Sequence, residues 1–150
     1  MWIFLTMMAY AEGDCLTAQC DAPAPPALDA VSVLDQPLAS CSTAPMTGWY
    51  RDSYCRTDAR DRGVHVVCAT MTDAFLTYTK AQGNDLTTPS PRSKFPGLKA
   101  GDKWCLCASR WLQAHQAGAA PTPVLSATHE KALGIIPKAV LFDAAASSSR

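Results

Sequence analysis

The chain is organised around the stretch Phe95-Pro-Gly-Leu-Lys-Ala-Gly-Asp-Lys-Trp-Cys-Leu-Cys-Ala-Ser-Arg-Trp-Leu-Gln-Ala-His-Gln-Ala-Gly118. Two turn dipeptides, Pro96-Gly97 and Gly101-Asp102, precede its centre, because glycine reaches the positive φ that tight turns need. Towards its end, Ser109 is placed to cap a helix and Gly118 to stop it. The stretch therefore predicts turns, then a strand, then a helix.

The run Lys103–Cys107 at the centre of this stretch alternates with period two. In a strand, Cys105 and Cys107 would point to the same face. The alternative is a helix that begins at Asp102 and places the two cysteines about 200° apart. We favour the strand, and only the strand directs both thiols to one place.

Hydrophobic period and capping residues predict the other elements of the chain. They are strands at 64–69 and 124–127, and helices at 73–82, 109–117 and 129–134. Strands and helices mix without a regular βαβ rhythm, which is typical of α+β proteins. We therefore expect a single compact α+β domain with a mixed, largely antiparallel sheet and about three short helices.

The length of 150 residues suits one ordinary core. We expect this domain at 31–143, after an N-terminal tail and proline-rich linker at 1–30 that is disordered, and before a C-terminal tail at 144–150. The apolar run Met1–Ala11 ends in an Ala-x-Ala step, as signal peptides do, but it lacks a basic region and is short for one. We expect a cytoplasmic protein, with signal or organelle targeting left open.

Lysine plus arginine and aspartate plus glutamate each number 13, so the formal net charge is zero. Nucleic acids and anionic membranes attract clustered positive charge, so we expect neither as a partner. No apolar run approaches the roughly 20 residues of a membrane span. Phosphate-binding loops and the order of serine hydrolase triads are also missing from the sequence. A small molecule or another protein remains open as the partner.

Several short motifs are distinctive. They are Cys41-Ser42, Pro45–Gly48, Tyr50–Asp52, Cys55, His65–Met71, Gly83–Leu86, Phe95–Leu98, Gly101-Asp102, Trp104–Ala108, Arg110-Trp111 and Ala127–Glu130. Together they resemble a family of small, mostly bacterial proteins, the domain of unknown function DUF2237. The resemblance implies one small domain and no particular activity, since none is established for the family. The family shows two adjacent cysteines where this chain has Tyr54-Cys55, so a mechanism that needs both thiols would lack one here.

The first candidate chemistry is a soft-metal site, with zinc as the possible cofactor. Its candidate ligands are Cys55, Cys68, Cys105, Cys107 and His65, because thiolate and imidazole groups suit zinc. Two thiolates on one strand face would need a further ligand from elsewhere. His65 and Cys68 fall on opposite faces of their strand, so they are not an obvious pair.

The second candidate is a catalytic or redox thiol, with Cys105 and Cys107 as candidate nucleophiles. A thiol becomes nucleophilic when a neighbouring cation or a helix N-terminus stabilises its thiolate. His129, at a predicted helix start, and Arg110, just after the cysteine pair, are the candidate partners. Sequence spacing does not show whether the fold brings them together.

The interpretation that we favour is a structural or interaction module in which the cysteines fill a tightly packed core. On this interpretation Arg51 and Arg110 pair with Asp52 or Asp102, and the charged loop at 54–63 is a solvated surface. The chain has seven cysteines, an odd number. If the Ala9-Tyr-Ala11 step is not processed, we expect the cysteines of the domain to be reduced.

Overall fold

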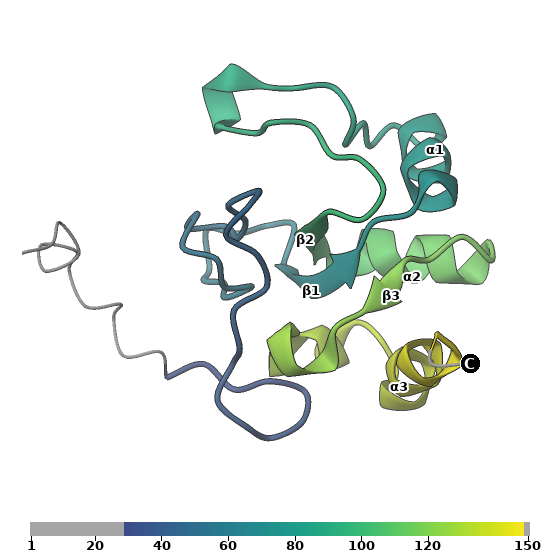
Figure 1. The fold of residues 1–150 in the computed structure, drawn as a ribbon. Coiled ribbons are helices and arrows are strands. Elements are labelled where there is room, and N and C mark those ends of the chain that lie inside the picture. The colour runs from purple at the N-terminus through teal and green to yellow at the C-terminus, as the bar shows by residue number, and fades with distance from the viewer. Residues whose placement is uncertain (1–28, 149–150) are drawn as a thin grey trace, which may run out of the picture.

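The structure, a computed structural model, describes residues 29–148 (Figure 1). The predicted tail and linker at 1–30 lies almost wholly outside the described residues, so its disorder stays a prediction. Within the described part, no helix is long and apolar enough to cross a membrane.

Three strands form one antiparallel sheet. β1, His65–Thr70, is central, with β2, Lys103–Cys107, on one side and β3, Thr122–Pro123, on the other. β1 is β-branched and apolar at its centre, which suits a strand buried on both faces. The sheet confirms the predicted α+β fold, and it confirms the strand rather than a helix from Asp102.

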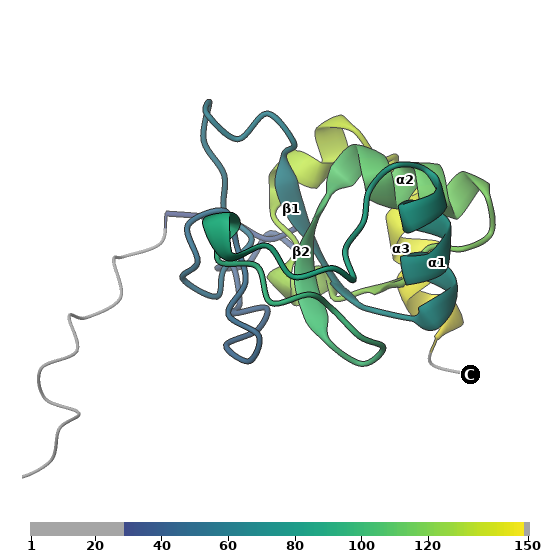
Figure 2. The same cartoon turned by 90° about the horizontal axis from the view of Figure 1, so that it is seen from above.

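The described part of the chain contains three α-helices: α1, Asp73–Ala81, α2, Ala108–Gln116, and α3, Lys138–Ser147. The hydroxyl of Thr72 caps α1 by accepting a hydrogen bond from the Phe75 amide at 3.1 Å. α1 and α2 match their predicted bounds to within one residue. Figure 2 shows the helices on one side of the sheet and the irregular segment that precedes β1 on the other.

The segment after β3 differs from its prediction. A 3-10 helix, Leu125–Ala127, occupies the place of the strand predicted at 124–127, and a second one, Glu130–Gly134, that of the predicted α-helix. β3 ends at Pro123, although the Val124 amide still donates to the Cys68 carbonyl at 2.7 Å. The Cys68 amide donates to the Thr128 hydroxyl at 3.2 Å instead of back to the Val124 carbonyl, and the ladder with β1 stops there.

The prediction of a C-terminal tail at 144–150 is also corrected by the structure. α3 continues through Ser147, so Ala144–Ser147 is helical rather than part of a separate tail. Pro137 suggests a helix stop in the sequence, but in the structure it precedes the first turn of α3, where a missing N–H costs nothing. Leu141 anchors α3 in the core and is fully buried.

Two buried clusters hold the domain together. The larger one lies between the sheet and the helices and includes Phe75, Trp111 and Leu141. The indole of Trp111 is satisfied inside it, since Nε1 donates to the Pro121 carbonyl at 2.9 Å. The smaller cluster is made of cysteines with one alanine: Cys41, Cys55, Cys68, Cys105 and Ala127. It joins the irregular segment before β1 to the strands.

Candidate functional site

The end of β2 and the start of β1 bring a thiol and an imidazole together. Cys107, the last residue of β2, is the register partner of His65, the first residue of β1. The Cys107 Sγ lies 3.1 Å from the His65 Nε2, which is hydrogen-bond distance for this pair. The register shifts between His65 and Val67, and such an irregularity re-aims a side chain at the end of a ladder.

Asp61 holds the other ring nitrogen of His65. Its Oδ1 lies 2.6 Å from Nδ1, and a carboxylate only accepts hydrogen bonds, so Nδ1 carries a proton. Its Oδ2 accepts from the His65 amide at 2.9 Å and from the Thr57 hydroxyl at 2.8 Å. The Asp61 side chain is fully buried. These contacts orient the imidazole and leave Nε2 facing the Cys107 sulfur.

The electrostatics favour a protonated His65. Its hydrogen bond with Cys107 raises the pKa of His65 to about 9, against the opposing effect of burial and with further help from Asp61. Burial raises the pKa of Asp61, but the hydrogen bonds from His65 and Thr57 outweigh it and leave this pKa below its usual value. At neutral pH the trio therefore contains a carboxylate and an imidazolium.

Cys107 lies between two positively polarised features, the His65 ring and the N-terminus of α2. It is the free cysteine among residues 29–148 and is partly exposed. It also occupies the N-cap position of α2, where the positive end of the helix dipole favours negative charge. Two independent features, an imidazolium and a helix N-terminus, act on one sulfur.

Two residues close over the pair. A Cβ on Gly63 would lie 2.5 Å from the His65 Cε1 and 2.9 Å from the Cys107 Sγ, so only glycine fits against them. On another side Trp49 stacks on the His65 ring, with centroids 6.0 Å apart and planes inclined by 12°. The imidazole is thus confined by packing as well as by Asp61.

A cavity of about 360 Å³ opens beside His65. This volume falls in the range of small-molecule sites. Its wall contains His65 and Trp49 together with Trp104, Phe95 and Arg51. The cavity thus reaches the ring that contacts Cys107.

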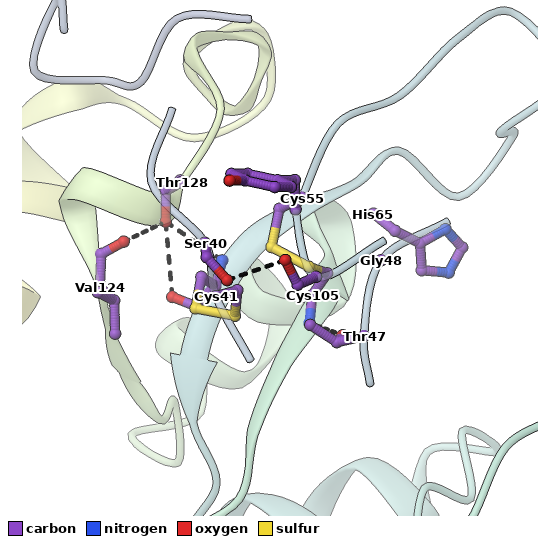
Figure 3. Close-up of a disulfide and its surroundings, with 12 residues drawn as sticks. Ser40, Cys41, Thr47, Gly48, Cys55, His65, Cys105, Val124 and Thr128 are labelled. Carbon is purple, nitrogen blue, oxygen red and sulfur yellow. Dashed lines mark hydrogen bonds between the residues drawn. A yellow bond between two sulfur atoms is a disulfide. The ribbon is translucent and has the colours of Figure 1, made fainter. Parts of the chain in front are cut away.

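The other four cysteines of the domain form two disulfides, Cys41–Cys68 and Cys55–Cys105. Figure 3 shows the two bonds close together, with the labelled His65 ring pointing away from them. The expectation of reduced cysteines is therefore wrong for these four in this structure. They come from different segments, and that pairing is not visible from sequence spacing.

The candidate metal ligands are divided between the disulfide cluster and the Cys107–His65 contact. Cys55, Cys68 and Cys105 are bonded in disulfides, whereas Cys107 and His65 contact each other. The sulfurs of Cys41, Cys55 and Cys68 lie within 4.8 Å of one another. As disulfides these sulfurs are not thiolates, so the cluster offers soft ligands only after reduction.

The remaining predicted site residues have other contacts. His129 is buried, and its Nδ1 accepts from the Lys131 amide at 3.1 Å; burial lowers its pKa. Arg110 donates to the Gln82 carbonyl and to the Gln113 side chain, both away from β2. The two cysteines of β2 therefore have different partners. Cys105 forms a disulfide, and Cys107 contacts His65 rather than the predicted His129.

Asp61 was missed because its loop is rich in charges and resembles a solvated surface. Its carboxylate is nevertheless buried against His65 and Thr57. The available signal was an acid four residues before a histidine at the start of an apolar strand, with Gly63 between them.

A search of the curated proteins finds no match to this chain. A family profile, described as an uncharacterized protein conserved in bacteria, matches residues 31–145. This range includes Asp61, His65 and Cys107, and the four cysteines that are bonded within residues 29–148. The chain belongs to the DUF2237 family, with a cysteine-rich core whose bonded and free cysteines occupy different places.

Proposed function

We propose that this protein is a thiol-dependent enzyme in which Cys107 is the nucleophile, His65 the acid and base, and Asp61 the residue that orients His65. The observation that carries the proposal is the continuous chain of contacts Sγ···Nε2 at 3.1 Å and Nδ1–H···Oδ1 at 2.6 Å. A nucleophile, a base and an orienting group in hydrogen-bond contact are the recurrent signature of covalent catalysis. A cysteine that merely fills a core needs neither neighbour.

The reaction class that suits this trio is acyl transfer to water or to another acceptor. The Cys107 thiolate attacks the carbonyl carbon of an ester, thioester or amide, forming a C–S bond and a tetrahedral oxyanion. The oxyanion collapses, and the leaving group departs with the proton of the His65 imidazolium. Neutral His65 then takes a proton from water, whose oxygen attacks the thioester carbon and releases the acid and the thiolate.

Selective alkylation tests the proposal. Full-length protein with intact disulfides is treated with limiting iodoacetamide at pH 7, and the labelled cysteine is located by peptide mass spectrometry. We expect Cys107 to react first, and His65→Asn to slow its alkylation by roughly 100-fold. His115→Asn is the matched control, because His115 stacks on Trp111 away from the site.

Turnover gives the second readout. With 4-nitrophenyl acetate we expect an initial burst of nitrophenol and a covalent acetyl group on Cys107, both absent in Cys107→Ser. If Cys107 of the native protein reacts no faster than a free thiol and acquires no acetyl group, the proposal fails. The structural or interaction module that the sequence favoured would then be the better account.

The two disulfides also bear on location. Disulfides persist in oxidising compartments and are rare in the cytosol. We therefore propose an oxidising compartment rather than the cytoplasmic location expected from the sequence. Thiol trapping in intact cells, followed by mass spectrometry, tests this: Cys41, Cys55, Cys68 and Cys105 should resist the trap, and labelling of all four would contradict it.

A further inference from the structure

The wall of the cavity beside His65 contains a cation that forms no ion pair with the residues that the structure describes. Arg51 lies in its wall, yet it takes part in none of the ion pairs formed within residues 29–148. The carboxylates expected to pair with it have other partners: Asp52 binds Arg56, and Asp102 binds Lys99. The sequence-based pairing of Arg51 is therefore wrong, and its charge faces the cavity without compensation from those residues.

The guanidinium is nevertheless held firmly. Its Nη1 donates to the Gly48 carbonyl at 2.6 Å and its Nη2 to the Ser93 carbonyl at 3.0 Å. Its plane lies over the Trp104 ring, with the central carbon 4.9 Å from the ring centroid. Arg51 itself has a φ of 54°, an uncommon conformation for a residue other than glycine. Packing and hydrogen bonds thus fix the group in one place.

One donor of this fixed group is unused. Nε of Arg51 is buried and has no hydrogen-bond partner. Buried donors are normally satisfied, so an orphan of this kind requires an explanation. Burial also lowers the pKa of Arg51, the direction expected for a cation without a counter-ion. Nε itself is closed to solvent, so a ligand acceptor would reach the second N–H of Nη2, whose first N–H donates to the exposed Ser93 carbonyl.

The remaining wall limits the ligand. Trp49, Trp104, Phe95 and Leu86 offer flat apolar surfaces for a planar or apolar body. Asp85 also lines the cavity; its carboxylate accepts from the hydroxyls and amides of Thr87 and Thr88 and lies 4.0 Å from the Lys80 Nζ. This carboxylate repels a dianion such as a phosphate ester more strongly than a monoanion, so a monoanion suits the cavity better.

We infer that Arg51 is the anchor of a carboxylate subsite, and that the acyl substrate of Cys107 carries a carboxylate on an aromatic or apolar body. The inference rests on the proposed function for the reaction, but the subsite itself is a binding property. Trp49 connects the Arg51 subsite with the proposed catalytic residues, because it lines the cavity and stacks on His65. A substrate held by Arg51 would lie with its other end against His65, which lines the cavity and whose Nε2 contacts the Cys107 sulfur just outside the wall.

Binding of benzoate and of benzamide tests the subsite without any chemistry. The two probes have nearly the same shape and differ in charge. Isothermal titration against the full-length protein should give at least about tenfold tighter binding of benzoate, as expected for one charge-assisted hydrogen bond. Inorganic phosphate is the third probe and should bind more weakly than benzoate.

Two variants test whether Arg51 causes the preference for benzoate over benzamide. Arg51→Gln should abolish the preference for benzoate, while Arg92→Gln, which removes one exposed positive charge from the neighbouring loop, should retain it. Equal binding of benzoate and benzamide by the native protein, or a preference that survives Arg51→Gln, overturns the inference. Because the two probes are compared on the native protein itself, a misfolded variant does not block the test. An inert Cys107 with tight benzoate binding would refute only the proposed function, whereas a reactive Cys107 without benzoate selectivity would refute only this inference.

Discussion

Cys105 and Cys107 lie two residues apart on one strand, yet they have opposite chemical states. Cys105 is 1% exposed and bonded to Cys55, whereas Cys107 is partly exposed and free. Their side chains point to the same face of β2, so their different bonding states come from the groups that each sulfur contacts. Cys105 meets another sulfur in a dry cluster, and Cys107 meets an imidazole at the edge of the sheet. Apolar surroundings favour the neutral disulfide of Cys105, whereas Cys107 contacts a titratable ring at the partly exposed edge of the sheet.

The comparison predicts that the disulfide-bonded region contributes most to stability. The Cys55–Cys105 bond closes a separation of 50 residues and ties the segment before β1 to β2. The double variant Cys55→Ala, Cys105→Ala should lose about 2–5 kcal/mol of unfolding free energy, measured by urea denaturation without reductant. A loss below about 1 kcal/mol would show that packing, not the bond, holds this region.

The next test is a substitution of Asp61, the buried residue of the trio that contains the free Cys107. Asp61→Ala leaves the His65 amide and ring without acceptors, so we expect a loss of about 1–3 kcal/mol. The same variant should also slow alkylation of Cys107, since the imidazole loses its orientation. Asp58→Ala, in the same loop and paired with exposed Arg60, is the control. Equal effects of the two substitutions would contradict the proposed role of Asp61.

A pH titration sharpens the contrast further. The folded-state pKa of His65 is raised to about 9 from an ordinary value of 6.5. Its protonated form therefore adds stability that is complete below about pH 6.5 and is lost as pH rises through 9. The difference in unfolding free energy between native protein and His65→Asn should shrink over this window. A difference that stays constant from about pH 6 to about 9.5 would mean that His65 is neutral.

Cys107→Ser should have the smallest effect on folding. The side chain is partly exposed and makes no covalent bond, so above about pH 9, where His65 is no longer charged, we expect a change within about 0.5 kcal/mol in urea denaturation. The same variant should lose all thiol reactivity at this position. A destabilisation as large as that of the disulfide variant would identify Cys107 as core filler.

Local patterns in the sequence were sufficient for much of the fold. The period-two run Lys103–Cys107 and the Thr72 cap depend on neighbouring residues alone, and both are found as predicted. The end of the chain was less readable, because Pro137 is compatible with either a stop or a start of a helix. Proline restricts its own φ in both cases, so only packing of Leu141 decides that a helix follows.

The sequence by itself also determined which residue types carry the chemistry: cysteines on one strand face, and His65 at the start of another strand. Only the tertiary structure decided how they combine. Antiparallel pairing of β1 and β2 brings Cys107 to His65, across a separation of 42 residues. The fold of the preceding loop buries Asp61 behind that ring. Bonds and ion pairs form over a few ångströms in space, and sequence distance places no limit on which residues the fold brings that close.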